Sequence, residues 1–127
     1  MRALLVIALL VGTASAEENA RDDGTPKGFA TYPGSRELCR QHVSGNKMHI
    51  IWSSHASRDE LAKVVAFYEK ALGKKAKAEA NGAKAIQADA NRHVTIYPVA
   101  SEGRLPTCTK KSMAGEKTIV MLSHAIR

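Results

Sequence analysis

Two cysteines, Cys39 and Cys108, are the residues of this chain with the most obvious chemical potential. A pair of thiols forms a disulfide bond, or stays reduced and acts as a nucleophile or a metal ligand. In the reduced alternative, His42 lies three residues after Cys39 and would serve as a base or as a second ligand. An even cysteine count without a CxxC pair favours a disulfide in an exported protein. We therefore predict a bond between Cys39 and Cys108.

Five histidines are candidate metal ligands, because imidazole nitrogen binds zinc and copper well. They are His42, His49, His55, His93 and His124. In the strands predicted below, His49 and His93 alternate with apolar residues and would face away from the helix, where His124 could join them. No pair has the local spacing of a known metal site. We expect no bound metal and no cofactor, and we keep a small metal-binding protein with sheet-face histidines as an alternative.

Sequence motifs of the common enzyme classes are absent from the chain. It contains no GxSxG, GxGxxG, Walker loop, HExxH or CxxCH pattern. Ser54 and His55 combine a hydroxyl with an imidazole, but adjacent residues of an extended segment point to opposite sides. We therefore expect a protein that is not an enzyme and has no catalytic residues.

A basic segment is the strongest indication of a binding partner. Its five lysines fall within fifteen residues and are Lys70, Lys74, Lys75, Lys77 and Lys84. The whole chain carries a formal net charge of +7, which favours contact with anionic polymers or acidic proteins. No aromatic residue separates these lysines, so stacking on nucleic-acid bases is not supported. Two structural explanations compete with binding: cations stabilise helix C-termini, and lysines protect exposed strand edges.

The N-terminus has the pattern of a secretory signal peptide over residues 1–16. Arg2 precedes an apolar run over 3–12, and Ala14-Ser15-Ala16 forms a small-x-small cleavage pattern. Residues 17–28 are charged and lack apolar periodicity, which predicts a flexible leader. The remainder, 29–127, is long enough for a single domain and has no stretch long enough to cross a membrane. We expect an exported protein, periplasmic or secreted.

The clearest secondary-structure signal is a helix over residues 58–72. Apolar residues recur there at helical spacing and would form a buried stripe: Leu61, Val64, Val65, Tyr68 and Leu72, widened by Phe67. Ser57 followed by Glu60 has the pattern of a capping box at the start of the helix. Gly73 is a favourable residue for ending it.

Short apolar segments on either side of this helix predict an antiparallel sheet. Asn81-Gly82 is a strong hairpin signal, and it predicts two arms over 75–80 and 83–89. The other predicted strands cover 38–43, 47–54, 92–99 and 118–126, and 101–116 is a polar loop. Short connections favour an α+β fold, in the order β-β-α-β-β-β. We expect an antiparallel sheet of about five strands with one amphipathic helix packed on one face.

The turn Tyr32-Pro33-Gly34-Ser35, followed by the helical sequence SRDELAKVVAFYEKALG at 57–73, resembles a group of small exported bacterial domains of unknown function. In that group a YPG turn precedes a VxxFYxxxLG helix. The resemblance covers residues 32–126 and implies a one-helix α+β sheet in a periplasmic or secreted protein. It implies no activity.

These observations favour a non-enzymatic exported module that contacts an anionic envelope component or a protein through its basic hairpin. One alternative is an inhibitor or accessory factor of a secreted enzyme. It would act through the 101–116 loop, which carries Arg104, Lys110 and Lys111.

Overall fold

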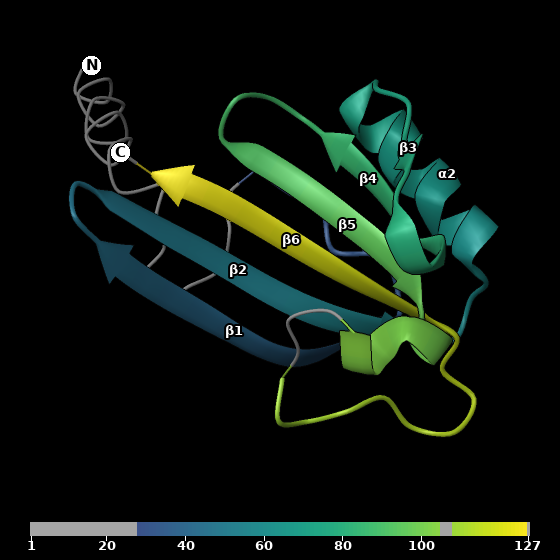
Figure 1. Ribbon diagram of the computed structural model, residues 1–127. Helices are drawn as coiled ribbons and strands as arrows, with labels where there is room; N and C mark the ends of the chain where they lie inside the picture. Colours follow the sequence, from purple (N-terminus) through teal and green to yellow (C-terminus); the bar gives the residue numbers. More distant parts are fainter. Residues whose placement is uncertain (1–27, 105–107, 127) are drawn as a thin grey trace, which may run out of the picture.

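The computed structural model describes residues 28–104 and 108–126, which form a six-stranded antiparallel sheet with an α-helix against one face (Figure 1). The strands are β1 (Arg36–Gly45), β2 (Met48–Ser57), β3 (Lys77–Ala78), β4 (Lys84–Gln87), β5 (Arg92–Pro98) and β6 (Thr118–Ile126). Their order across the sheet is β1-β2-β6-β5-β4-β3. The predicted α+β class is confirmed. The sheet has six strands where about five were expected, and the order is β-β-α-β-β-β-β, because both arms of the hairpin form strands. The two-residue β3 is the shortest of the six.

The helix α2 (Leu61–Leu72) begins three residues later than predicted. Ser57 is not its N-cap. It is the last residue of β2 and pairs with Thr118 of β6, and its hydroxyl accepts a hydrogen bond from the Asp59 N–H at 3.0 Å. Pairing between strands therefore overrides the local capping signal, and Glu60 occupies the N-cap position without a side-chain cap. The predicted end is confirmed, because Gly73 has a φ of 66° and its N–H bonds to the Glu69 carbonyl.

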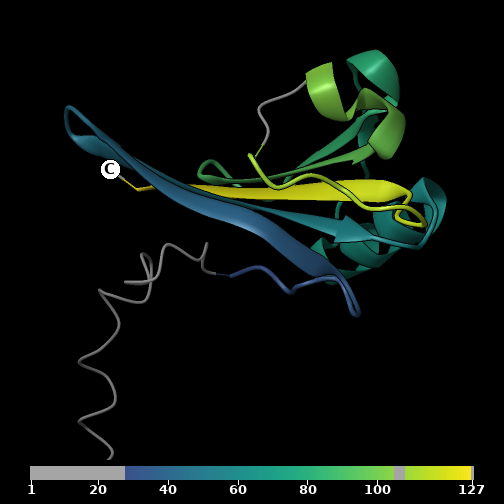
Figure 2. The same cartoon turned by 90° about the horizontal axis from the view of Figure 1, so that it is seen from below.

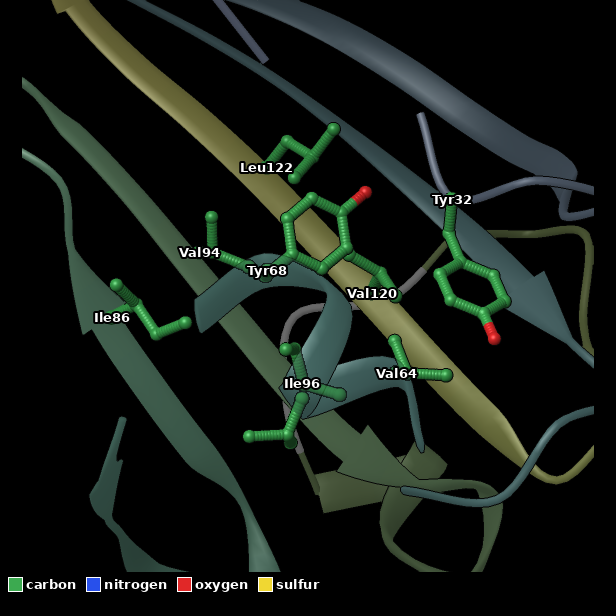
Figure 3. Close-up of a cluster of buried hydrophobic side chains, with 9 residues drawn as sticks. Tyr32, Val64, Tyr68, Ile86, Val94, Ile96, Val120 and Leu122 are labelled. Carbon is green, nitrogen blue, oxygen red and sulfur yellow. The ribbon is translucent and has the colours of Figure 1, made fainter. Parts of the chain in front are cut away.

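One hydrophobic core lies between α2 and the sheet. Val64, Val65 and Tyr68 of α2 are buried as predicted, while Leu61, Phe67 and Leu72 are partly buried around them. Figure 3 shows Tyr68 lying over β6 beside Leu122 and Val120. The sheet contributes the remaining buried side chains from its β4, β5 and β6 half: Ile86, Val94, Ile96, Val120 and Leu122.

The segment before β1 closes the edge of this core. Its turn is formed as the Pro-Gly pair predicts: the Ser35 N–H donates to the Tyr32 carbonyl at 3.0 Å, and Gly34 has a φ of 79°. Tyr32 is buried in the core, and the Tyr68 hydroxyl donates to the Ala30 carbonyl at 2.7 Å.

A second, smaller core lies on the opposite face of the sheet. Its buried residues are Leu38, Ala56, Ala83, Tyr97, Cys108 and Ile119. The short 3₁₀ helix η3 (Val99–Arg104) lies on this side of the sheet (Figure 2). The predicted disulfide is present here, joining Cys39 to Cys108 with 5.7 Å between their α-carbons. Cys39 follows an irregularity in the β1–β2 pairing, and this bulge places both Leu38 and Cys39 against the second core.

The hairpin predicted from Asn81-Gly82 is also present. Both residues have positive φ, 61° and 77°, and the Ala83 N–H bonds to the Ala80 carbonyl at 3.2 Å, as in a type I′ turn. Its strands are shorter than the predicted arms because only Lys77 and Ala78 pair with β4. None of the helices described in 28–104 and 108–126 is long and apolar enough to span a bilayer. The predicted signal peptide (1–16) and all but the last residue of the predicted leader lie outside the described residues.

Candidate functional site

The end of α2 and the segment that follows it position the first three lysines of the predicted basic segment. The Gly73 and Lys74 N–H groups both bond to the carbonyl of Glu69, at 2.9 and 3.3 Å. The carboxylate of Glu69 then accepts a bond from the Ala76 N–H at 2.8 Å. Glu69 thus bonds to three of the four residues that follow the helix, and these bonds hold the backbone on both sides of Lys75.

Three of the five predicted lysines come together at the C-terminal end of α2. Lys70, Lys74 and Lys75 line a shallow cavity of about 320 Å³, together with Ala66, Glu69 and Gly73. All three lysines are exposed. Their positive charges therefore border one concave surface, which is open to solvent and to any anionic group that enters it.

Of the lysines at 75 and 77, both within the predicted first hairpin arm, only Lys77 lies in a strand. Lys75 precedes β3 and is not in the strand. Lys77 pairs with Ala85, whereas Lys84 pairs with Ala78 and Ile96, so the two side chains project from opposite faces of the sheet. Lys84 is half-buried on the α2 face, and Lys77 is exposed. The hairpin therefore presents positive charge on both faces.

The five predicted lysines differ in charge pairing from Lys63 and Lys117. Lys63 lies 3.7 Å from Asp59, and Lys117 lies 3.8 Å from Glu60. Within 28–104 and 108–126, no ion pair involves any of the five predicted lysines. Although Glu69 borders the same cavity, none of the five ammonium groups lies within ion-pair distance of a described carboxylate.

The helix macrodipole accounts for only part of this cluster. Lys70 is the basic residue of the last turn of α2, where a cation is favourable. The effect falls off beyond the terminal turn, so it gives no reason for lysines at 77 and 84. Edge protection fits Lys77, because β3 is an outer strand of the sheet. Neither the helix dipole nor edge protection explains the other lysines of the cluster.

The loop that follows η3 is held in place at several points. The backbone N–H and the hydroxyl of Ser112 donate to the carboxylate of Glu102 at 2.9 and 2.6 Å. The Met113 N–H donates to the carboxylate of Glu116 at 2.7 Å, and the Glu116 N–H returns a bond to the Met113 carbonyl at 3.0 Å. These bonds form a small turn that leaves the Met113 side chain 62% exposed.

The basic residues predicted for this loop are only partly described. Lys110 and Lys111 are exposed, and Arg104 ends η3. Residues 105–107 lie outside the described part of the chain.

The strand register separates the histidines that were expected to gather on one face. His49 is in register with Ile126, and His124 with Ile51, so both lie on the face that carries α2. His93 is in register with Ser123 and therefore lies on the other face. The expected cluster of three imidazoles is not formed. Among the described residues, there is no group of three or more His, Cys, Asp or Glu side chains placed to hold a metal ion.

The hydroxyl–imidazole contact of β2 involves Ser53. Ser54 is adjacent to His55 in the strand and lies on the opposite face, as expected. The Ser53 Oγ lies 2.9 Å from the Nε2 of His55, because residues two apart in a strand share a face. Ser53 is only 2% exposed, and burial lowers the pKa of His55. This burial favours a structural role, in which the two polar side chains satisfy each other.

The remaining candidate nucleophiles are the cysteines, and they are not available as thiols. Both belong to the disulfide, and the described part of the chain contains no free cysteine. Cys108 is buried, at 4% exposure. The reduced alternative, with His42 beside Cys39, does not occur in this structure.

Comparison with known proteins gives no relative: no protein-family model matches the chain, and neither a curated protein nor a solved structure shows significant similarity to it.

Proposed function

We propose that this protein is a non-enzymatic exported module that binds an anionic polymer through its basic surface, defined as Lys70, Lys74, Lys75, Lys77 and Lys84. The observation that carries the proposal is the charge pairing described above: these lysines have no acidic partner in the described structure, whereas Lys63 and Lys117 do. Unpaired lysines on a surface of net positive charge raise the local concentration of anions and speed their association.

The shape of the basic surface favours a polymer over a small anion. The cavity beside Lys70, Lys74 and Lys75 is shallow and open, and the two other lysines project from different sides of the hairpin. A single phosphate or carboxylate in this cavity would leave Lys77 and Lys84 without a contact. A chain of repeated negative charges contacts several of them in turn, and affinity then accumulates from many weak contacts. The same lysines could also bind an acidic protein surface, which is the second kind of partner we propose.

The disulfide supports the exported part of the proposal. Cystine bonds persist in oxidising compartments and are rare in the cytosol. The signal-like pattern of residues 1–16 provides the route by which the chain would reach such a compartment.

The proposal is tested with heparin as the anionic polymer. Raising the salt concentration from about 10 mM to about 150 mM shortens the Debye length from about 30 Å to about 8 Å, so affinity should fall steeply. The triple variant Lys70→Gln, Lys74→Gln, Lys75→Gln should bind at least about tenfold more weakly at low salt, the change given by a loss of about 1.4 kcal/mol. Calorimetry or fluorescence polarisation provides the affinities.

A matched control separates a defined surface from net charge alone. The variant Lys47→Gln, Lys63→Gln, Lys110→Gln loses the same number of charges outside the basic surface and should retain most of the affinity. An absence of binding at low salt contradicts the proposal, as do an affinity independent of salt and an equal loss in both triple variants. Acidic lipid vesicles and a teichoic-acid-like polymer in parallel distinguish among anionic partners.

A second candidate function is inhibition of a secreted enzyme through the loop around Met113. The observation that favours it is an exposed apolar side chain on a turn held by hydrogen bonds, since a rigid loop loses little entropy on binding. Inhibition assays against a panel of purified secreted hydrolases test this function. Any inhibition found should be lost in Met113→Asp and kept in Lys110→Gln, and inhibition that survives Met113→Asp would exclude this loop as the contact.

A further inference from the structure

Two histidines at the free end of the β1–β2 ribbon lie against each other. The Nε2 of His42 is 3.1 Å from the Nδ1 of His49, and their ring centroids are 5.1 Å apart. The hydroxyl of Ser44 lies 3.0 Å from the same Nδ1 atom. Three polar side chains therefore converge on one point of the ribbon.

The strand register explains how they meet. Ser44 is directly opposite His49, and His42 is opposite Ile51, so His42 and His49 are diagonal neighbours on the same face. The turn at Asn46 and Lys47 holds this register, since Gly45 and Met48 form the last pair. The ribbon end projects beyond the β4–β5 turn (Figure 2), whereas α2 packs on the β4, β5 and β6 half of the sheet. Both imidazoles are accordingly exposed to solvent.

We infer that His42 and His49 form a surface site for a divalent transition-metal ion, zinc or copper. Neutral imidazole is a good ligand for both ions, and two nitrogens already lie at the separation of neighbouring ligands. A tetrahedral zinc ion with Zn–N bonds of about 2.0–2.1 Å holds two ligand nitrogens about 3.3–3.4 Å apart. The 3.1 Å separation in the structure differs from this by a few tenths of an ångström, which small rotations of two exposed rings provide.

Binding requires one rearrangement of protons. In the contact between the rings one nitrogen donates its proton and the other accepts it. A nitrogen that binds the ion must give up its proton, so the neutral ring that donates shifts to its other tautomer through solvent. The Nε2 of His42 and the Nδ1 of His49 then both direct lone pairs at the ion, and the two other ring nitrogens carry the protons.

The number of protein ligands and the nearby charges determine how the site would hold an ion. Two protein ligands leave coordination positions to water, so the site is an open one that exchanges its ion, unlike a closed four-ligand structural site. The nearest basic side chain on the same face of β1 is Arg40, which makes two hydrogen bonds with the carboxylate of Glu37, at 2.8 and 2.9 Å. That ion pair reduces the repulsion between the guanidinium and an incoming cation.

Titration of the full untagged protein with zinc chloride, and separately with copper chloride, tests the site. Calorimetry should give one ion per chain, and His42→Ala and His49→Ala should each weaken binding by roughly tenfold or more, because one ligand cannot hold the ion alone. His93→Ala is the matched control: it removes an imidazole on the other face of the sheet, beside Gln87, and should leave the affinity unchanged.

A second measurement locates the ion without relying on affinity. In NMR spectra of the histidine rings, zinc should shift the resonances of His42 and His49 and leave those of His93 in place. Unchanged circular dichroism spectra show that the variants remain folded. Equal affinity in all three variants overturns the inference, and so does a zinc-induced shift confined to histidines other than this pair. These outcomes are independent of heparin binding, which involves the other end of the sheet.

Discussion

The guanidinium of Arg36 at the start of β1 makes two hydrogen bonds with the carboxylate of Glu116, 80 residues later in the chain, at 3.0 and 2.8 Å. Arg36 also donates to the carbonyl of Lys111, and Glu116 accepts the Met113 N–H. One ion pair therefore joins the outer strand of the sheet to both ends of the turn that carries Met113.

Replacing Arg36 should change the titration of Glu116. The hydrogen bond from Arg36 holds the pKa of this carboxyl below its ordinary value of 4.5, and in Arg36→Gln the pKa should move up toward that value. A carboxylate with a lowered pKa stabilises the fold above its unfolded pKa, and this contribution is lost as the pH falls through the folded pKa. The stability difference between the two proteins should therefore shrink below about pH 4. NMR titration of the Glu116 carboxyl measures the shift.

The control for this prediction is Arg40→Gln, which removes the ion pair of Arg40 with Glu37 and should leave the titration of Glu116 unchanged. An unaltered Glu116 pKa in Arg36→Gln would contradict the assigned cause.

Removing the disulfide should cost much of the net stability. Its two cysteines are separated by 69 residues, and the chain-entropy model assigns a loop of this length about 4 kcal/mol. The double variant Cys39→Ala, Cys108→Ala should show a free energy of unfolding lower by about that amount in urea titrations. Adding reductant should destabilise the wild type similarly and leave the variant unchanged. A variant as stable as the wild type would contradict the prediction.

Removing one buried hydroxyl should weaken the contact between α2 and the segment before β1. Tyr68 is 1% exposed, and its hydroxyl donates to the Ala30 carbonyl at 2.7 Å. Tyr68→Phe keeps the ring and loses this bond, so we expect a loss of about 1 kcal/mol. Tyr68→Ala also leaves a cavity and should cost about 3–5 kcal/mol. Urea unfolding of both variants provides the comparison. An unchanged free energy of unfolding in Tyr68→Phe would contradict the role of the hydroxyl and assign the whole effect to the ring.

The stability of the protein should depend on His55 in mildly acidic solution. Burial lowers the pKa of His55 from its ordinary value of 6.5, so the unfolded chain takes up this proton more readily than the folded one. Stability from this group is complete above pH 6.5 and decreases as the pH falls toward the folded pKa. His55→Gln cannot titrate there, and its free energy of unfolding should decline less between pH 7.5 and pH 5. Parallel pH profiles for the two proteins would contradict this assignment.

Local sequence signals predicted the features that depend on neighbouring residues. The apolar stripe of α2, the glycine that ends it, and the Pro-Gly and Asn-Gly turns each follow from a few adjacent side chains and backbone preferences. The start of the helix could not be predicted in this way. Ser57 has the right side chain for a cap, but its pairing with Thr118, far along the chain, keeps it in β2.

The candidate sites could likewise be predicted only in part, because they also depend on which strands pair and in which register. The sequence grouped five lysines because they are close in the chain, and the structure keeps Lys70, Lys74 and Lys75 together while the pleat of the hairpin separates Lys77 from Lys84. The pairing of His42 with His49 depends on the exact register of β1 on β2. A register shift of one residue would place the two rings on opposite faces. The turn at Asn46 and Lys47 sets that register, whereas the predicted strands over 38–43 and 47–54 placed the connection at 44–46.

The position of β6 between β2 and β5 has a consequence for synthesis of the protein. The β1–β2 hairpin and the β3–β4–β5 meander each form from nearby residues. Among the described strands, only Thr118–Ile126 pairs with both of them. This strand is the last of the six to leave the ribosome, so the two halves cannot be joined in one sheet before it emerges. The sheet therefore stays incomplete until Thr118–Ile126 has been synthesised, however early the two halves form.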